Sequence, residues 1–509
     1  MRLICILFWT WLFALKGLFQ LASCRPFLSD KRDAGLVKDC GSNPPYLPPT
    51  VTNTSQRLSA LRSLMDSNNV TVYVIPATDP HLSEYIAPQD ARRAWITGFS
   101  GTAGTAVVSK MKATLWTDGR YWIQAERQMD CNWELNKGET TIVDWILNET
   151  REGDIVAADP FVFSIVEWES YKKPLLQGKR QFVAEEKNLV DIIWGADRPP
   201  NPTDDIFKVP DQFFERTWQM KVKEIRAQMK ENPYRPTALL ISALDETAWL
   251  FNLRGDDIPY NPFFKSYTLL TENFIRLFVN ESRLPQHIKK YLNTACTTDM
   301  CVQLKPYTDI RQNLQEYAKG NVKIWIGQEY TTYGVYEVIP ESKLLIDRYS
   351  PVQLTKSVKD STEQKGLKAA HVRDAVAVIR YFVWLEKNVP KGTVTEVSGA
   401  DYVNKLRSEQ KYSKGISFET ISASGLNAAL AHYSPNNETN RKLSPDEMYL
   451  VDSGGQYLDG TTDITRTLHW GTPTDFQKEA YTRVLMGNID LARSVFPANT
   501  IGSIALLVE

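Results

Sequence analysis

Residues 451–467 read VDSGGQYLDGTTDITRT, and this stretch decides the fold of the last third of the chain. Two β-rich runs flank the dipeptide Asp459-Gly460, which is a strong signal for a tight turn. Asp452 lies in the first run, and Asp463 lies at the start of the second. The pattern therefore predicts one β-hairpin that carries both carboxylates.

Two carboxylates on one hairpin form a candidate metal site. A buried, ionised carboxylate needs a partner, because burial of an unpaired charge is costly. A divalent cation is one such partner, and oxygen ligands suit Mn²⁺, Mg²⁺, Zn²⁺ or Ca²⁺ according to geometry. The competing interpretation is that both Asp residues are ordinary turn and surface residues.

The register of the hairpin bears on this choice. If Asp459-Gly460 is a two-residue turn, Asp463 lies opposite Gln456 and on the same face as Asp452. The two carboxylates would then be about 13 Å apart along the strand, too far to share a metal. A bulge at Gly454-Gly455 would shorten this gap. Without such a bend or a longer turn, the sequence predicts no shared metal site.

The hairpin belongs to a strand-rich α+β region that we assign to residues 354–509. Ser361 and Gln364 fit a capping box at the start of a long amphipathic helix. The sequence Asn388-Val389-Pro390-Lys391-Gly392 ends that helix. His432 lies in a loop before the hairpin, and on its own it is more typical of a partly buried structural histidine than of a functional one.

Two α/β units precede this region, and we assign them to residues 55–197 and 198–353. In each unit an amphipathic helix precedes a β-branched or aliphatic strand, as in residues 57–78 and 216–242. The order of the elements is similar in both units, although the sequences show no clean repeat. We therefore expect two related α/β domains in tandem.

Residues 1–24 have the pattern of a signal peptide. Arg2 precedes an apolar run, and small residues end at Cys24. Lys16 interrupts the apolar run, which favours a signal peptide over an uncleaved membrane anchor. Residues 25–54 read as a polar, proline-containing linker. We therefore expect a chain that is secreted or held at the extracellular face of the plasma membrane.

Cysteines and sequons fit the secretory route. If the signal peptide is removed, the remaining cysteines are Cys40, Cys131, Cys296 and Cys301. Their spacing favours a local Cys296–Cys301 bridge, which leaves Cys40 to pair with Cys131; free buried thiols are the alternative. The candidate N-glycosylation sites are Asn53, Asn69, Asn148, Asn280 and Asn437.

Composition argues against some partners. The chain of 509 residues is 43% hydrophobic and 23% charged, with a formal net charge of -1. This near-neutral balance gives no electrostatic case for binding nucleic acid or an anionic membrane surface. A membrane would be a partner only if a longer form carried a C-terminal anchor.

Several segments together resemble the aminopeptidase P (Xaa-Pro aminopeptidase) family. They are SEYIAPQDARRAWITGFSGTAGTA (83–106), LWTDGRYWIQAERQMD (115–130), NLVDIIW (188–194), ALDETAWLFNLRG (243–255), HVRDAVAV (371–378), WLEKNVPKG (384–392), NAALAHYSP (427–435) and the hairpin itself. The resemblance extends over about residues 55 to 500.

The resemblance implies a fold, a reaction and a metal site. It implies two creatinase-type N-terminal α/β domains followed by a pita-bread metallopeptidase domain, commonly in homodimers. It implies hydrolysis that removes the N-terminal residue from proline-containing peptides with Pro in second position. Two divalent metal ions, Mn²⁺ in most members and Zn²⁺ in some, would activate a hydroxide. Asp452 would be a ligand of one ion, Asp463 would bridge both, and His432 would bind substrate.

The sequence departs from the family after Asp463. Family members supply a further His ligand from an HGxGH-type segment and two later Glu ligands. Here His469, Glu479 and Glu509 follow Asp463, and none has such a setting. We therefore expect an incomplete ligand set, an incomplete pita-bread domain and an inactive chain. The alternative is a non-catalytic, secreted binding or dimerisation protein of the same ancestry.

Overall fold

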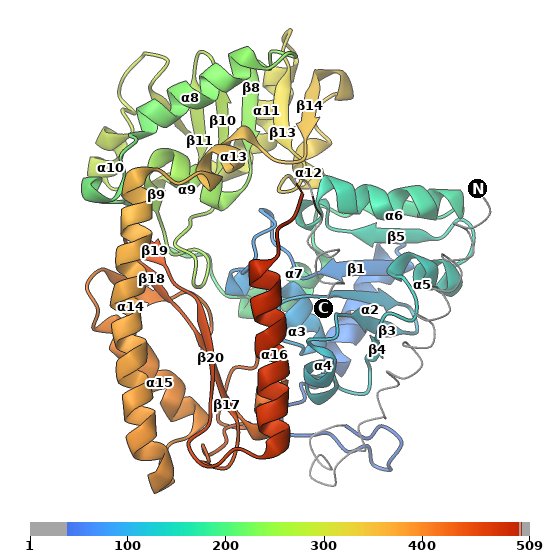
Figure 1. Ribbon diagram of the computed structural model, residues 1–509. Helices are drawn as coiled ribbons and strands as arrows, with labels where there is room; N and C mark the ends of the chain where they lie inside the picture. Colours follow the sequence, from blue (N-terminus) through green and yellow to red (C-terminus); the bar gives the residue numbers. More distant parts are fainter. Residues whose placement is uncertain (1–37, 498–499, 501–509) are drawn as a thin grey trace, which may run out of the picture.

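The computed structural model describes residues 38–497 and residue 500. The predicted signal peptide and the first part of the predicted linker lie outside these residues. Figure 1 shows three units: the first at the right, the second at the top and the third at the left. None of the helices in the described part of the chain has both the length and the apolar character to cross a membrane.

The first unit is a six-stranded sheet with helices on both faces. Its strands have the order β4-β3-β2-β1-β5-β6. They are β1 (Val72–Pro76), β2 (Thr105–Ser109), β3 (Ala113–Trp116), β4 (Glu134–Asn136), β5 (Ile155–Ala158) and β6 (Gln181–Ala184). Its helices are α2 (Ser55–Ser67), α3 (Arg92–Thr97), α4 (Trp122–Gln128), α5 (Ile142–Glu149), α6 (Ile165–Gln177) and α7 (Leu189–Trp194).

The second unit repeats this topology, with the strand order β12-β11-β10-β8-β13-β14. Its strands are β8 (Ala238–Ile241), β10 (Tyr267–Thr271), β11 (Ile275–Phe278), β12 (Val302–Lys305), β13 (Ile324–Gly327) and β14 (Leu344–Asp347). Its helices are α8 (Trp218–Glu231), α9 (Leu244–Phe251), α10 (Gln286–Tyr291), α11 (Ile310–Ala318), α12 (Tyr333–Tyr336) and α13 (Pro351–Ser357). Strands β7 (Phe207–Lys208) and β9 (Leu253–Arg254) form a separate short pair.

The central strands explain why both units fold alike. Alternate residues of β1 enter two different apolar clusters, with Tyr73 in one and Val74 in the other. In β8, Leu239 and Leu240 divide between two clusters in the same way. A strand that is apolar on both faces requires cover on both faces of its sheet, and helices provide it. The expectation of two related α/β domains is confirmed by this shared topology.

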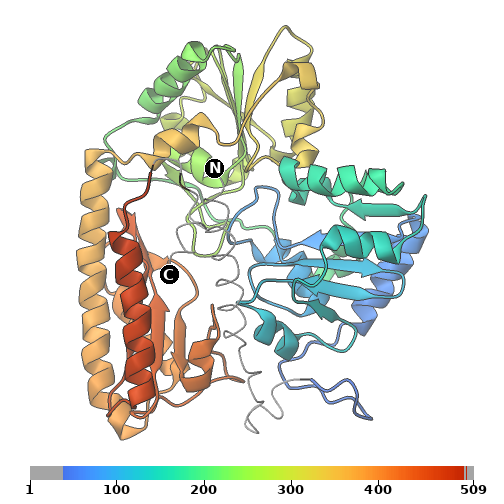
Figure 2. The same ribbon diagram turned by 45° about the vertical axis from the view of Figure 1, so that its right-hand side comes forward.

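The third unit combines long helices with two three-stranded sheets, β15-β18-β19 and β16-β17-β20. Its strands are β15 (Ser413–Ile416), β16 (Ile421–Ser424), β17 (Tyr449–Ser453), β18 (Gly455–Tyr457), β19 (Gly460–Thr461) and β20 (Ile464–Leu468). Its helices are α14 (Ser361–Asn388), α15 (Glu396–Ser408) and α16 (Asp475–Arg493). Figure 2 shows α14 and α16 running alongside these strands.

Helix α14 ends where the sequence predicted, but its capping box starts one residue earlier. Asp360, not Ser361, is the N-cap, and its carboxylate accepts from the backbone N–H of Glu363. The Glu363 carboxylate accepts in turn from the N–H of Asp360, at 2.9 Å. Aspartate caps as well as serine does, and its charge also suits the positive end of the helix dipole.

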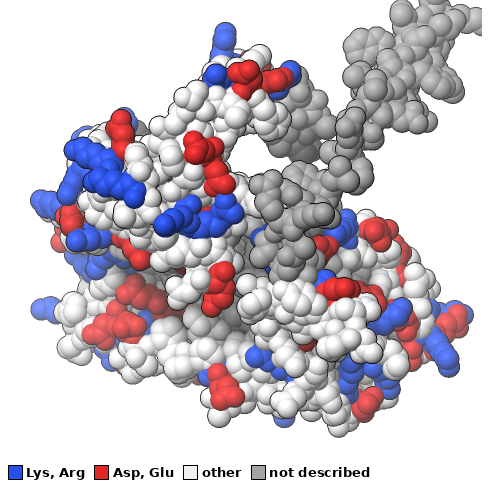
Figure 3. All heavy atoms as spheres, turned by 90° about the horizontal axis from the view of Figure 1, so that it is seen from below, with Lys and Arg blue, Asp and Glu red and all other residues white. Residues whose placement is uncertain are grey.

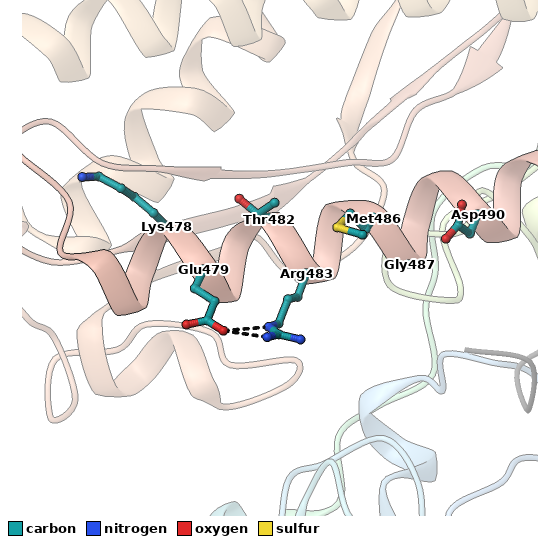
Figure 4. A pocket seen from close by; sticks show the side chains of 7 residues that line it. All are labelled: Lys478, Glu479, Thr482, Arg483, Met486, Gly487 and Asp490. Atoms are coloured by element: carbon teal, nitrogen blue, oxygen red, sulfur yellow. Dashed lines mark hydrogen bonds and ion pairs between the residues drawn. The ribbon is translucent and has the colours of Figure 1, made fainter.

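Helix α16 differs from the other long helices, because none of its residues is buried. Phe476, Val484 and Met486 are large apolar side chains of this helix that are more than half exposed. Figure 4 shows a shallow hollow along the helix, where Glu479 pairs with Arg483 at 2.7 Å. All residues that line this hollow belong to α16, and the Asp452/Asp463 pair is not among them.

Two disulfides join the four cysteines of the described chain. Cys40 pairs with Cys131, which ties the segment before α2 to the loop before β4. Cys296 pairs with Cys301 and closes a short loop in the second unit. This is the pairing that the spacing of the cysteines favoured.

Candidate functional site

The hairpin that carries the two carboxylates turns one residue earlier than the sequence predicted. Tyr457 pairs with Gly460, so the two-residue turn is Leu458-Asp459. Gly460 is instead a strand residue packed against α14, where an added Cβ would lie 3.0 Å from the Cα of Leu367. The glycine therefore serves the close approach of strand and helix, rather than the turn.

This shift brings the two carboxylates together. Further along the hairpin Ser453 pairs with Ile464, in the same register as the pairs beside the turn. The register places Asp463 beside Gly454 and not beside Gln456, two residues from Asp452 and on the same face. Diagonal neighbours of this kind are about 7–8 Å apart at their Cα atoms, and their side chains can meet. The expectation that a shared site needs a bulge was therefore wrong.

Gly454 lets the hairpin pass from one sheet to the next. A Cβ on Gly454 would collide with the carbonyl oxygen of Thr462 and with the hydroxyl of Ser417. The N–H of Ser417 donates to the Gly454 carbonyl at 3.2 Å. Three chain segments therefore meet at this point, and only glycine fits between them. The crossing fixes the strand residues on either side, including Asp452.

Asp452 is half-buried and short of partners. Its Oδ1 is buried and accepts no hydrogen bond from any residue that the structure describes. Burial raises the pKa of Asp452, a hydrogen bond with the Thr465 side chain lowers it, and the nearby Asp463 raises it again. Asp463 itself is exposed. A bound cation would stabilise a buried carboxylate oxygen that has no hydrogen-bond partner and lies beside a second carboxylate.

The described residues add no further ligand to this pair. Across residues 38–497, no group of three or more His, Cys, Asp or Glu side chains is arranged to hold a metal ion. His469 follows β20, and its Nε2 is buried without a hydrogen bond from described residues. Glu479 lies on α16 and pairs with Arg483. Glu509 lies outside the described residues.

His432 lies close to Asp452 of the hairpin. It is near enough to Asp452 to lower the pKa of that carboxyl, against the effect of burial. Its backbone has φ of +56°, a left-handed conformation that is uncommon for a non-glycine residue. The imidazole is exposed, and its Nδ1 is hydrogen-bonded to the hydroxyl of Tyr121 from the first unit.

A buried carboxylate anchors the loop that holds His432. Glu396, at the start of α15, is completely buried. It accepts hydrogen bonds from the hydroxyl of Tyr433 at 2.8 Å and from the side-chain amide of Asn427 at 3.0 Å. It also accepts from the backbone N–H of Arg441 at 2.9 Å. These contacts fix both flanks of the loop, so that His432 projects from a rigid base.

The first two units also border this site. The pKa of Tyr85, in the first unit, is raised by burial, and Asp452 and Asp463 are among the negative neighbours that add to it. The ring of Tyr85 meets the ring of Tyr260, from the second unit, with centroids 5.3 Å apart. Gln456 of the hairpin donates to the carbonyl of Tyr260 at 2.8 Å. Sequence reasoning missed these tyrosines.

The outer surface agrees with the near-neutral charge of the chain. Figure 3 shows cationic and anionic side chains interspersed on one face of the molecule. All five candidate glycosylation sites are exposed, in all three units. They are Asn53, Asn69, Asn148, Asn280 and Asn437.

Comparisons with known proteins agree with the three-unit architecture. Two models described as "Creatinase/Prolidase N-terminal domain" match residues 57–190 and 197–363. A model described as "Metallopeptidase family M24" matches residues 365–509.

Individual relatives extend this likeness over most of the chain. Xaa-Pro aminopeptidase 2 of Homo sapiens is 62% identical over 468 residues, which cover 92% of this chain and 69% of that protein. The Rattus norvegicus protein of the same name is 63% identical, with 92% and 70% covered. The chain thus spans about 70% of the length of these relatives.

A solved structure is similar at the level of the fold and of the sequence. It is an X-prolyl aminopeptidase from Caenorhabditis elegans, described as a cytosolic enzyme with a di-nuclear active site. The TM-score is 0.84 at 33% identity, with 89% of this chain and 76% of that chain covered. The architecture and these relatives show that the chain belongs to the aminopeptidase P family of Xaa-Pro aminopeptidases, which are metallopeptidases.

Proposed function

We propose that the site on the 449–468 hairpin serves the hydrolysis of peptides with proline in second position, with two divalent metal ions. Asp452 would be a ligand of one ion, and Asp463 would bridge both. The observation that carries this proposal is the buried, unpartnered Oδ1 of Asp452 beside a second carboxylate. The di-nuclear site of the C. elegans relative supports the number of ions.

The two carboxylates suit hard or borderline divalent ions. Their oxygens are the ligands that such ions prefer, and a cation would relieve the repulsion between them. We place Mn²⁺ first and Zn²⁺ second. A bound divalent ion would lower the pKa of a water molecule and stabilise developing negative charge on the substrate. Asp452 would contribute the fixed, half-buried ligand, while the exposed Asp463 can accept a second ion from the solvent side.

His432 would bind the substrate near its scissile carbonyl. Its exposed imidazole lies between the hairpin and the first unit, and the loop that carries it is anchored by Glu396. A neutral imidazole with its proton on Nε2 can donate to a carbonyl oxygen. The bond before proline has no N–H, so recognition of the peptide has to rely on carbonyl groups and on the proline ring.

Metal affinity should be weak in the chain of 509 residues. Two carboxylates are fewer ligands than a di-nuclear site needs, and the described residues supply no third. We therefore expect Mn²⁺ to bind far less tightly than to the human relative, and we expect little hydrolysis. The likeness of the first two units to creatinase-type domains implies no chemistry of its own.

The decisive experiment compares metal binding and hydrolysis in the same preparations. Mn²⁺ binding is measured by electron paramagnetic resonance, and hydrolysis is measured with an Xaa-Pro-Pro tripeptide. The variants are Asp463→Ala and Asp452→Asn, with Asp446→Asn as a distant surface control and the human relative as the positive control. We expect weak binding that either site variant reduces at least tenfold, with little turnover. Binding that both site variants leave unchanged would contradict the ligand assignment.

Turnover by this chain that Asp463→Ala abolishes would overturn the expectation of low activity. It would mean that other residues complete the metal site. Peptide binding without turnover would favour the second candidate function, a non-catalytic binding or dimerisation protein. The exposed apolar side chains of α16 favour that candidate.

We also propose that the protein is exported and forms homodimers. The two disulfides support an oxidising compartment, and the exposure of all five sequons would allow glycosylation. Enzymatic deglycosylation of secreted protein tests the first point by a loss of mass. Light scattering tests the second by the molar mass.

A further inference from the structure

Tyr121 connects the first unit to the site in the third. It follows the Asp118-Gly119-Arg120 turn and comes directly before α4. Its hydroxyl is hydrogen-bonded to Nδ1 of His432, although 311 residues separate the two. The two rings meet edge to face, with centroids 5.5 Å apart. The segment 115–130, which is part of the family resemblance, thus contains a residue that contacts the site.

The phenol of Tyr121 is held rigidly. Its side chain is 1% exposed. The ring of Phe99 packs edge-on against it, with centroids 5.8 Å apart. The hydroxyl of Thr102 lies 2.6 Å from the phenolic oxygen and can donate to it. A hydroxyl that accepts from Thr102 keeps its own proton free to donate toward His432.

The imidazole of His432, by contrast, has few restraints. In the described part of the chain, its ring makes one hydrogen bond, and that bond is to Tyr121. Glu396 fixes the backbone on either side, but it does not contact the ring. Tyr121 is therefore the one described residue that restrains the ring by a hydrogen bond.

We propose that Tyr121 is a positioning residue for His432. The Tyr121 O–H donates to Nδ1, which leaves the proton of the neutral imidazole on Nε2. The part of this inference that has Nε2–H donate to a substrate carbonyl rests on the proposed function. The tautomer itself does not, so the two can be tested separately.

Side-chain NMR of the 509-residue chain labelled with ¹³C and ¹⁵N in histidine tests the tautomer without metal or substrate. The sequence has 5 histidines, so a spectrum of His432→Gln identifies the signal of His432. We expect the Nε2–H form in spectra recorded at mildly alkaline pH. In Tyr121→Phe the ratio of Nε2–H to Nδ1–H should fall about fivefold, as expected for the loss of one neutral hydrogen bond.

Two further variants keep the test decisive. Tyr85→Phe removes a hydroxyl that is also near Tyr121 and the two carboxylates but has no hydrogen bond to His432, and it should leave the tautomer unchanged. Thr102→Val should shift the ratio in the same direction as Tyr121→Phe, and this variant covers the case in which Tyr121→Phe folds poorly. An Nδ1–H form in the unmodified chain, or a ratio that neither variant changes, would overturn the inference. Neither result would bear on the metal proposal.

Discussion

Asp374 on α14 contacts the 449–468 hairpin and Asp452 belongs to it, but of these two only Asp374 pairs with a cationic side chain. Arg407 binds Asp374 through two parallel hydrogen bonds, at 2.8 and 3.0 Å. Tyr457 donates to the same carboxylate at 2.8 Å. Asp452 has instead a second carboxylate for a neighbour and an unpartnered oxygen. Asp374 therefore stabilises the hairpin through its ion pair. The charge of Asp452 is not compensated within the fold and is available to a ligand.

The largest loss of stability should come from breaking the buried ion pair between Asp374 and Arg407. Arg407→Met leaves Asp374 buried and unpaired, and both side chains are at most 3% exposed. We expect a loss of about 3–5 kcal/mol in the free energy of unfolding. Denaturation by urea at neutral pH measures it.

The matched control is an exposed pair that joins α14 to the end of α15, as the Asp374–Arg407 pair joins α14 to α15. Arg380 pairs with Glu409 at 3.3 Å, and both side chains are about half exposed. Arg380→Met should cost less than about 1 kcal/mol, because solvent screens such a pair. If the two substitutions lowered the free energy of unfolding equally, burial would not account for the strength of the Asp374–Arg407 pair.

A third carboxylate sharpens the comparison through its pH dependence. Glu246 in α9 is buried with a serine hydroxyl as its partner, at 2.5 Å from Ser350. Burial raises its pKa from 4.5 to about 8. The pKa of Glu246 is higher in the folded protein than in the unfolded chain. Its contribution to stability is therefore fully present below the pKa of the unfolded chain, and it is lost as the pH rises through about 8.

The test is Glu246→Gln, which cannot ionise. Between about pH 5 and about pH 9, the unmodified chain should lose of the order of 3 kcal/mol relative to this variant. Unfolding midpoints across the pH range measure the difference. If the stability of the unmodified chain and that of Glu246→Gln changed with pH in the same way, Glu246 would have to be charged in the folded protein. It would then need a cationic partner that this structure does not show.

The smallest expected changes in stability come from two substitutions in the same hairpin, and they should be opposite in sign. Asp459, in the turn, pairs with Arg373 and is 5% exposed in its side chain. Asp459→Asn should therefore lower stability, by about 1–2 kcal/mol. Asp452→Asn should raise it by up to about 1 kcal/mol without metal, because it removes a half-buried charge that faces Asp463. A loss of stability in both variants would contradict the assignment of Asp452 as an uncompensated ligand.

The sequence predicted the elements well and the contacts between them less well. The β-branched residues of 70–78 predicted a strand, and the structure has β1 there. Burial of both faces of β1 was not predicted, because it depends on the helices that cover the sheet. The turn dipeptide predicted a hairpin but not its register. The register depends on how closely α14 approaches Gly460, and a local motif carries no information about that distance.

The site shows the same limit. Asp452, Asp463 and His432 were found through a family resemblance, whereas Tyr121 and Tyr85 were not singled out. Their approach to the hairpin depends on how the first unit docks onto the third, and no periodicity or spacing reports such long-range packing. A possible signal for Tyr121 was its place directly after the Asp118-Gly119-Arg120 turn.

The contact between Tyr121 and His432 also sets an order of events during biosynthesis. The first unit is complete once residues up to Trp194 have left the ribosome, but His432 emerges more than two hundred residues later. At ordinary rates of translation this delay lasts roughly tens of seconds. The nascent first unit therefore folds before Tyr121 can pair with His432. The contact forms only when the third unit docks, so it is among the last contacts of the protein to form.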